Sequence, residues 1–505
     1  MTLFKKGEFF PPTSDEARIE RYHVNREIFL GHHDSIFQSK QDLLTPEQLN
    51  KLYISSNIAG LICRKSADFL FGEKPTFTSG KKNNSNEQKR LEGLVNENGL
   101  YTKFYESAMS NSYRGDTFYK IRYGQKYGGL VDSTLDHYRV FIEPQKAEYV
   151  FIETIPGSNT VLAYHIAIPK VVEGTGDQEW ILDVESHYVG VIKYSKYQMS
   201  PLTFSSYENR VESWKIVKEL YSDREDVETE INEHLIVHIP NLKTDDMLFG
   251  IDDLTEHHSL FAELNNRLNK IAMILDKHSD PILAVPEDML EEDANGNRYL
   301  NASEMKAVGI QGKDDVKPEY IVWNASLDAA FRELDFILNQ ILLVTEMPGV
   351  ALGLQDSGTS GGSGLSIKWR MSPLLAKINR KRQYFDEGIK KILHVAQLLE
   401  HANNDNVDYE VFTPHISFKD GLPDDDREKA QIINMRTNGK STLSQKTALM
   451  EQYDMTEEQA EEEIKRIRAE DEADGLIPSS TNRGRVHKQE DPIVNQNEKR
   501  KGFDE

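Results

Sequence analysis

The chain has 505 residues, enough for about three domains, and a formal net charge of -23 at pH 7. This charge excludes a protein that grips nucleic acid over its whole surface, because phosphate neutralisation needs clustered Lys and Arg side chains. The single cysteine, Cys63, cannot form an intrachain disulfide and lies in an apolar run, so we expect a buried thiol in a reducing compartment.

The first part of the chain changes from helical to β pattern. Residues 1–45 are polar, partly helical, and carry no apolar stretch typical of a secretory signal. An apolar helix is predicted at 57–71, closed by Gly72. From 117 to 222 short β-branched and aromatic runs predict a mostly antiparallel meander. The runs are FYKIRY, HYRVFIEP, AEYVFIETI, AYHIAIP and HYVGVIKYS, and HLIVHIP at 234–240 is one more strand.

Two amphipathic helices are predicted at 254–277 and 325–344, with a small insert of short strands at 280–323 between them. The first helix leads away from the rest of the chain and the second returns to it, so together they predict a hairpin-like stalk with the insert as a small domain at its tip. Neither helix is predicted to span a membrane, because the most apolar stretch, 336–354, is interrupted by polar side chains.

A Gly/Ser-rich segment, TEMPGVALGLQDSGTSGGSGL at 345–365, separates the second of these helices from a long periodic helix at 372–403. A polar excursion held between two rigid helices is typical of a functional loop, with a solvated linker as the alternative. A strand at 411–418, three short helices to about 475, and a polar tail predicted to be disordered complete an α+β chain.

Motifs for catalysis or metal binding are weak. The segment from Asp293 to Glu304 has the oxygen ligands of a calcium loop, but Arg298 stands where glycine is required, so a tight turn is favoured. Residues 438–441 resemble the end of a phosphate-binding loop without its first glycine or its strand, so a helix-ending turn is favoured. His257 and His258 have no third ligand nearby.

The order of these parts resembles the portal proteins of tailed bacteriophages, most closely the siphophage portals of Gram-positive hosts. The segments that carry the resemblance are YHVNREIFLGHH, NIAGLICRKSADFLFGEKPTF, SAMSNSYRGDTFYKIRY, FIEPQKAEYVF, the stalk helices with their insert, TEMPGVALG, SGGSGLSIKWRM, ISFKDGLPDDDREKAQIIN and LSQKTALMEQYDMTEEQAEEEIKRIRAED. Their order and spacing, rather than any one motif, make the resemblance specific.

The resemblance implies a portal-type α+β fold with named regions. An N-terminal arm (1–45) precedes an α+β wing (46–250), the first stem helix (251–279), an α/β clip (280–323) and the second stem helix (324–345). A tunnel loop (346–365), the long wing helix with its strand (366–419), an α-helical crown (420–475) and the disordered tail (476–505) follow.

The resemblance also implies site residues of three kinds. Polar tunnel-loop residues expected to approach DNA are Gln355, Asp356, Ser357, Thr359, Ser360 and Ser363. Stem residues expected to face the channel or a neighbouring subunit are Arg267, Lys270, Lys277, Arg332, Asp335 and Asn339. Clip residues expected to take part in docking are Glu291, Glu292, Asp293, Asn297 and Arg298.

The implied function is a ring, normally of twelve subunits, at the unique capsid vertex of the virion, assembled in the host cytoplasm. Double-stranded DNA passes through the ring during packaging and ejection. The implied partners are further copies of the chain, the terminase large subunit, the head-tail adaptor, the scaffolding protein and the major capsid protein. The resemblance implies no membrane, no cofactor and no enzymatic activity.

Two alternatives remain open at this stage. A static connector ring in a defective prophage or a tail-like particle would use the same fold without moving DNA. A metal- or nucleotide-dependent hydrolase would rely on His257, His258 or Lys440, although no convergent set of acid, base and ligand surrounds them in the sequence.

Overall fold

A computed structural model describes residues 3–37, 53–279 with gaps at 83, 129, 133, 174–177 and 206–209, and 328–419 with a gap at 355–363. It also describes 282–284, 291–292, 298–299, 319–321, 421, 431, 434–437, 443–453 and 457–473. The chain divides into two compact units, residues 1–422 and 423–505, and each is considered by itself.

Helices form the N-terminal part of the first unit. They are α1 (Thr13–Leu30), α2 (His33–Phe37), α4 (Ile58–Phe71), α5 (Asn86–Glu97) and α6 (Leu100–Arg114). α4 begins where the side chain of Asn57 accepts a hydrogen bond from the Gly60 amide at 2.8 Å, which satisfies a backbone N–H that the helix itself leaves unpaired. The apolar helix predicted at 57–71 is confirmed to within one residue.

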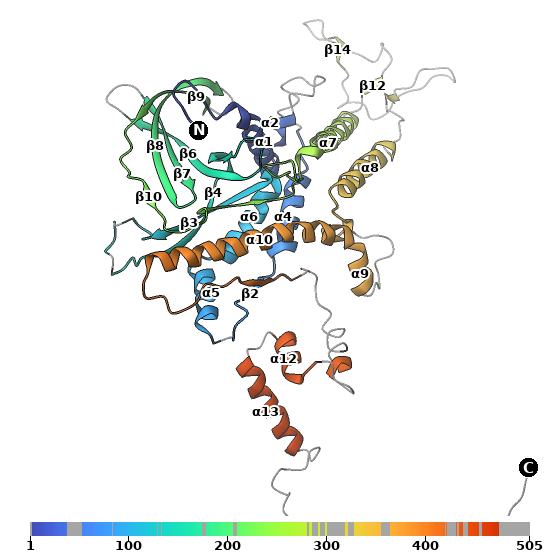
Figure 1. Cartoon of the computed structure of the whole chain (residues 1–505). Coiled ribbons are helices and arrows are strands. Elements are labelled where there is room, and N and C mark those ends of the chain that lie inside the picture. The colour runs from blue at the N-terminus through green and yellow to red at the C-terminus, as the bar shows by residue number, and fades with distance from the viewer. Residues whose placement is uncertain are drawn as a thin grey trace, which may run out of the picture. The chain divides into compact units, whose positions relative to one another are not determined.

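A seven-stranded antiparallel sheet follows in the order β1-β9-β8-β7-β6-β5, with β10 paired to β8 (Figure 1). Its strands are β1 (Phe9–Phe10), β5 (Val150–Thr154), β6 (Val161–Glu173), β7 (Gln178–Tyr188), β8 (Val191–Ser205), β9 (Arg210–Leu220) and β10 (Val227–Glu228). Consecutive strands from β5 to β9 are neighbours, so the predicted meander is confirmed for residues 150–220, whereas the runs FYKIRY and HYRVFIEP, predicted as part of it, belong to a separate sheet.

The run HYVGVIKYS, predicted as one strand, instead contains the turn between β7 and β8. Tyr188 pairs with Val191 across this turn, and Gly190 has a φ of 82°, which glycine adopts at little cost. β-branched residues on both sides of the glycine conceal the turn, because they fit a strand equally well before and after it.

A second, three-stranded sheet has the order β11-β3-β4, formed by β3 (Asp116–Gly124), β4 (Arg139–Gln145) and β11 (Ile236–Pro240). The long helix α10 (Ser372–Asn403) packs on it and has the bounds predicted from the sequence. Its Gly388 faces Ile239, and a Cβ at this glycine would lie 2.5 Å from the Ile239 side chain.

Helices α7 (His258–Ser279) and α8 (Asp328–Val344) lie side by side (Figure 1), and the 3-10 turn η3 (Thr255–His257) precedes α7. The predicted helix at 254–277 therefore starts as a 3-10 turn. Between α7 and α8, β12 (Ile282–Ala284) pairs with β15 (Glu319–Ile321), and β13 (Glu291–Glu292) pairs with β14 (Arg298–Tyr299). The predicted insert of short strands is confirmed.

The chain after α8 continues through η5 (Gly349–Leu352) and α9 (Gly364–Arg370) into α10. Beyond α10, β16 (His415–Ser417) pairs with β2 (Thr76–Thr78), so the strand predicted at 411–418 is limited to three residues. Helices and antiparallel strands occupy separate parts of the unit, and the predicted α+β class is confirmed.

The main apolar core lies among α4, α6, α10 and the three-stranded sheet. Cys63 is fully buried there, and this burial raises the pKa of its thiol to about 12. At one edge Gly115 (φ 91°) crosses Gly250 so closely that a Cβ at Gly250 would lie 2.1 Å from the Gly115 carbonyl oxygen. Neither glycine therefore tolerates a side chain.

The second unit contains α12 (Gln445–Tyr453) and α13 (Glu457–Ala473). The Lys446 Nζ lies 2.8 Å from a Glu457 carboxylate oxygen and 2.5 Å from one of Glu461, which joins the two helices at their surface. Two of the three short helices predicted for this region are confirmed, and most of the first, at 420–439, lies outside the described residues.

Candidate functional site

An ion pair joins the paired helices α7 and α8. Arg267 in α7 lies 2.6 Å from the carboxylate of Glu263 on the same helix and 3.0 Å from that of Glu333 on α8. Arg267 was predicted to face a channel or a neighbouring subunit, but its charge is already neutralised within the chain. Each exposed pair of this kind is worth up to about 1 kcal/mol.

The other predicted residues of these helices divide by exposure. Arg332, Asp335 and Asn339 are exposed on α8, Lys270 is half-buried on α7, and Lys277 lies near the C-terminal end of α7. Large apolar side chains accompany the exposed polar ones, with Phe336 62% and Leu343 71% exposed. α8 therefore presents a mixed polar and apolar face to its surroundings in the first unit.

The segment that follows α8 is held against α10 at its start. Glu346 adopts a φ of 57°, unusual for a residue with a side chain, and its carboxylate pairs with Arg380 of α10. At the other end, α9 leads into α10 with Trp369 72% exposed. The predicted loop residues all lie outside the described residues: Gln355, Asp356, Ser357, Thr359, Ser360 and Ser363.

A buried cluster of charges lies where η3, α6, α8 and α10 meet. Lys377 Nζ lies 3.4 Å from a carboxylate oxygen of Asp253, and Lys381 Nζ donates to the other carboxylate oxygen. Ser112 of α6 also donates to Asp253, and Lys377 donates to the carbonyl oxygen of Thr345 at 3.2 Å. All five residues are buried or nearly so, and the cluster ties the start of the paired helices to the end of α8.

The charges in this cluster support one another electrostatically. Burial alone would raise the pKa of Asp253, but the positive charges of Lys377 and Lys381 outweigh it and lower that pKa below its ordinary value. Burial lowers the pKa of Lys381, and the Asp253 carboxylate opposes this shift. Burying a carboxylate with two lysines costs desolvation free energy. Removing one of the partners costs more, because it leaves a buried charge unpaired.

A second polar group links α1 to the beginning of α7. Asn25 donates to the Tyr113 carbonyl oxygen at 2.9 Å and to the Thr255 hydroxyl at 3.0 Å, and its side-chain oxygen lies 2.7 Å from His258 Nε2. His258 thus has a structural partner, and burial lowers the pKa of half-buried His257. These histidines belong to the helix base, and Lys440, the third hydrolase candidate, lies outside the described residues.

The residues predicted for docking lie on the insert between α7 and α8. Glu291 and Glu292 form β13, and Arg298 lies opposite Glu292 in β14. Asp293 and Asn297 lie outside the described residues, as do most positions of the weak calcium motif. Among the described residues, no group of three or more His, Cys, Asp or Glu side chains could hold a metal ion.

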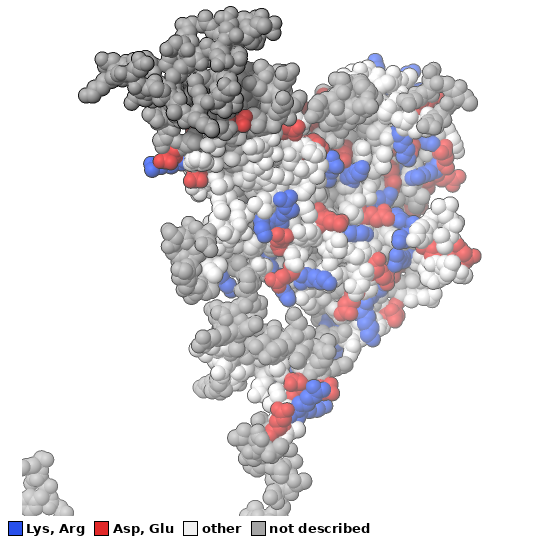
Figure 2. Space-filling model, turned by 180° about the vertical axis from the view of Figure 1, so that it is seen from behind, with Lys and Arg blue, Asp and Glu red and all other residues white. Residues whose placement is uncertain are grey.

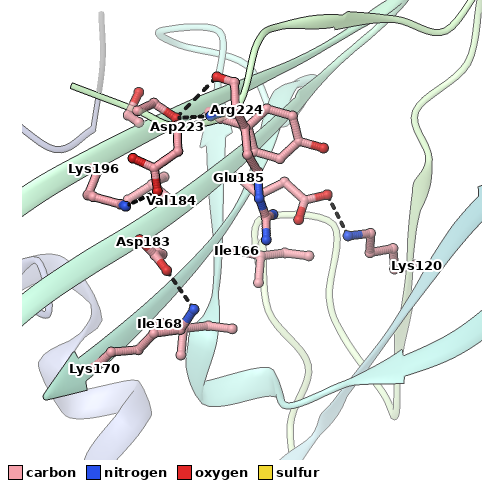
Figure 3. Close-up of a pocket in the computed structure, with 13 residues that line it drawn as sticks. Lys120, Ile166, Ile168, Lys170, Asp183, Val184, Glu185, Lys196, Asp223 and Arg224 are labelled. Carbon is pink, nitrogen blue, oxygen red and sulfur yellow. Dashed lines mark hydrogen bonds and ion pairs between the residues drawn. The ribbon is translucent and has the colours of Figure 1, made fainter. Parts of the chain in front are cut away.

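A polar cavity of about 350 Å³ opens between the seven-stranded sheet, β3 and the segment at 222–224 (Figure 3). Its lysines pair with its carboxylates: Lys120 with Glu185 at 2.5 Å, Lys170 with Asp183 at 2.5 Å, and Lys196 with Asp223 at 2.7 Å. The three lysines are thus neutralised, and Arg224 is the one further charged side chain of the lining.

The charged surface is mixed rather than basic. Figure 2 shows Lys and Arg interspersed with Asp and Glu over the visible face, without a continuous basic area. None of the described helices is long and apolar enough to cross a membrane. The face drawn therefore lacks the clustered positive charge that tight phosphate binding needs.

Asp253, Lys377 and Lys381 were not predicted as site residues from the sequence. One signal was present, because Lys377 and Lys381 lie four residues apart on the stripe of α10 that also carries Ile378 and Phe385. Charged residues at positions that the helical period assigns to the core need a buried partner. The partner itself, more than a hundred residues earlier in the chain, had no local signal.

Comparisons with known proteins give a family and similar solved structures. The family model described as "Phage portal protein, SPP1 Gp6-like" matches residues 170–475, which include α7, α8 and α10. A solved structure, "Neck of empty GTA particle computed with C6 symmetry", contains a chain with 9% sequence identity and a TM-score of 0.43. The match covers 83% of the present chain and 93% of that chain. No curated protein matches the sequence.

Proposed function

The chain belongs to the phage portal protein family, of the SPP1 Gp6-like type, and from this membership we propose that it forms a ring at one capsid vertex through which DNA is packaged and ejected. The observation that carries the proposal is the family match over residues 170–475, which contains every residue singled out on the paired helices and their loop. Portal proteins are structural, so no catalytic role is assigned to the chain.

The regions of the ring follow from the order of elements. In this proposal α7 and α8 form the stem, the strands between them the clip, and residues 346–365 the tunnel loop. The two sheets with α10 form the wing, with residues 1–45 as an arm, and α12 and α13 belong to the crown. The clip docks the terminase during packaging and a head-tail adaptor afterwards. Twelve copies are the expected number, and scaffolding and major capsid proteins are further partners.

The charge pattern suits a channel in which DNA must slide. A bore lined with clustered cations would hold phosphates through counterion release and oppose movement. The net charge of -23 and the ion pairing of Arg267 with Glu263 and Glu333 both reduce this attraction. Arg332 and Asn339, exposed on α8, are the stem residues best suited to occasional phosphate contacts.

Electron microscopy of the purified full-length protein, with its mass measured by light scattering, tests the ring. We expect closed rings with a central hole wide enough for duplex DNA, and the top views give the subunit number. A protein that stays monomeric at all salt and protein concentrations, and also in the presence of its scaffolding and capsid proteins, would contradict the proposal.

DNA packaging with the tunnel loop shortened tests its role separately. Deleting residues 356–363 removes the polar Gly/Ser segment, and we expect rings to assemble normally while packaging of DNA into capsids is lost. A deletion variant with unchanged packaging would remove the loop from the mechanism without affecting the ring. Deleting residues 479–486 of the polar tail, the same length of chain, serves as the control.

A further inference from the structure

The loop between β3 and β4 exposes a group of large apolar side chains. Leu130 is 91% exposed, Leu135 79%, Tyr138 61% and Tyr127 50%. We call these four residues the apolar tip. Single exposed apolar residues are common on protein surfaces, but four within twelve residues of one loop indicate a contact site for another protein.

Hydrogen bonds within the loop hold its shape. The buried carboxylate of Asp136 accepts the backbone N–H groups of Lys126 at 3.0 Å and Tyr127 at 2.8 Å, and Gln125 donates to the Asp136 carbonyl oxygen at 2.9 Å. Asp132 accepts the amide of Thr134 at 2.8 Å. The apolar tip is thus presented by a loop with its own polar framework, which reduces the entropy lost on binding.

Contacts along α10 fix the position of the apolar tip. Gly388 packs against Ile239, which pairs with Thr117 near the start of β3. Further along the helix, Lys391 lies 3.5 Å from Glu233, two residues before Leu235, whose carbonyl oxygen accepts the Ile121 amide. α10 and β3 therefore run in the same direction, and β3 leads to the apolar tip.

Contacts at the C-terminal end of α10 agree with this direction. Glu400 lies 2.8 Å from Arg90, which also pairs with Glu97. The next residue, Asn98, donates to the carbonyl oxygen of Val140 in β4, opposite Tyr123 at the end of β3. Figure 1 draws the loop after β3 beside this end of the helix.

The N-terminal end of α10 holds the start of the proposed tunnel loop, through the contacts of Lys377 with Thr345 and of Arg380 with Glu346. Lys377 and Glu400 are separated by about 35 Å of helix at 1.5 Å per residue. If residues 346–365 lie at the bore of the ring, α10 carries the chain outward, and the apolar tip lies on the outer rim.

We propose that the apolar tip docks the ring into its capsid, inserting Leu130 and Leu135 into an apolar groove of the surrounding shell protein. The inference rests on the proposed portal function, because only a ring gives α10 an inner and an outer end. Its position at the end of α10 away from the proposed tunnel loop favours the shell over DNA, which has no apolar groove for leucine. A neighbouring copy of the chain is the other occupant that the test must exclude.

The experiment co-expresses the full-length chain with the shell and scaffolding proteins of the same phage and counts portal subunits per purified capsid. The double variant Leu130→Ser, Leu135→Ser removes the apolar surface without touching the core, so its folding should be unchanged. We expect rings like those of the wild type, and about tenfold less portal protein per capsid because two exposed leucines no longer become buried.

A matched control and a rescue accompany this variant. Tyr221→Ser removes an apolar side chain that is 90% exposed elsewhere, and its incorporation should match the wild type. Leu130→Met with Leu135→Met keeps the apolar surface and should restore incorporation.

Three results would overturn the inference, and they differ from one another. Normal incorporation of the serine variant shows that the apolar tip does not bind the shell. Loss of the rings themselves in that variant assigns the apolar tip to contacts between copies of the chain. Absence of rings in the wild-type protein instead removes the proposed portal function on which the inference rests.

Discussion

The Nζ of Lys377 in α10 lies 3.2 Å from the carbonyl oxygen of Thr345, the residue that follows α8. This contact connects the end of one paired helix to the long helix that packs on the three-stranded sheet. Asp253, just before η3, completes the connection because it pairs with Lys377 and Lys381 together. One buried carboxylate therefore links the start of the first paired helix, through the two lysines of α10, to the end of the second.

Replacing this carboxylate should destabilise the first unit strongly. In Asp253→Asn two buried lysines lose their counter-charge, and we expect the free energy of unfolding to fall by about 3–5 kcal/mol. Urea unfolding followed by tryptophan fluorescence measures the change. The control is Asp386→Asn, which breaks the half-exposed pair with Lys390 at 2.5 Å and should cost about 0.5 kcal/mol or less. Equal losses in the two variants would contradict the role of the buried cluster.

Stability should fall as the pH drops below about 6.5, the ordinary pKa of histidine. His165 and His187 are buried in the seven-stranded sheet, and burial lowers the pKa of each. The unfolded chain then binds more protons than the folded one, so stability is fully present above pH 6.5 and decreases below it. Each histidine contributes a slope of up to about 1.4 kcal/mol per pH unit.

His187→Gln should make this acid slope shallower, measured as the urea midpoint at several pH values between 5 and 7.5. A second decrease is expected at lower pH from Glu185. Its burial would raise its pKa, but His187 and Lys120 together lower it to about 2, so its contribution is lost only as the pH falls below about 4.5. An unchanged slope in the variant would show that His187 binds its proton equally in the folded and unfolded states, so that burial does not lower its pKa.

The variant Glu346→Gly should be more stable than the variant Glu346→Ala. Both Glu346→Gly and Glu346→Ala lose the surface ion pair with Arg380, so they differ mainly in backbone preference at a φ of 57°. A left-handed conformation costs about 1 kcal/mol or more with a Cβ present, and we expect the glycine variant to be more stable by about that amount. A more stable alanine variant would mean that the turn after α8 is not fixed in this conformation.

Removing the charge of Arg332 should change the salt dependence of DNA packaging, and removing that of Arg267 should not. Arg267 is neutralised by Glu263 and Glu333, whereas Arg332 is exposed on α8. If the stem surrounds DNA, Arg332→Gln should weaken the salt dependence of packaging, since one phosphate contact fewer releases fewer counterions. Arg267→Gln should change only stability, by up to about 1 kcal/mol. Salt dependence unchanged from that of the wild type in both variants would place neither arginine at the DNA.

Periodic segments were predictable from the sequence, and long-range pairings were not. The bounds of α10 follow from its apolar spacing, with Pro373 in the first turn and Asn403 at the end. The pairing of Phe10 with Trp214 joins residues some two hundred positions apart, and neither segment carries a sign of its partner. The same limit applies to Asp253 and its lysines, because their pairing is recognisable only from the folded structure.

The apolar tip illustrates a further limit. Leu130 and Leu135 look like ordinary members of a polar loop in the sequence, since their exposure depends on the turn that Asp136 organises. Asx-type hydrogen bonds are local, so residue types can predict them. The direction in which the neighbouring leucine side chains project cannot be predicted in this way. The contrast between a predictable turn and an unpredictable surface is general for loops that join neighbouring strands.

The burial of Cys63 makes fluorescence labelling of this protein straightforward. It is the single cysteine of the chain, and its buried thiol, with a pKa of about 12, stays protonated and unreactive toward maleimide dyes at neutral pH. A cysteine introduced at Ser357 or at Leu130 would then carry the dye alone in each subunit. Energy transfer between such dyes would report the spacing of neighbouring loops or rims while DNA moves, without removing any native residue of the core.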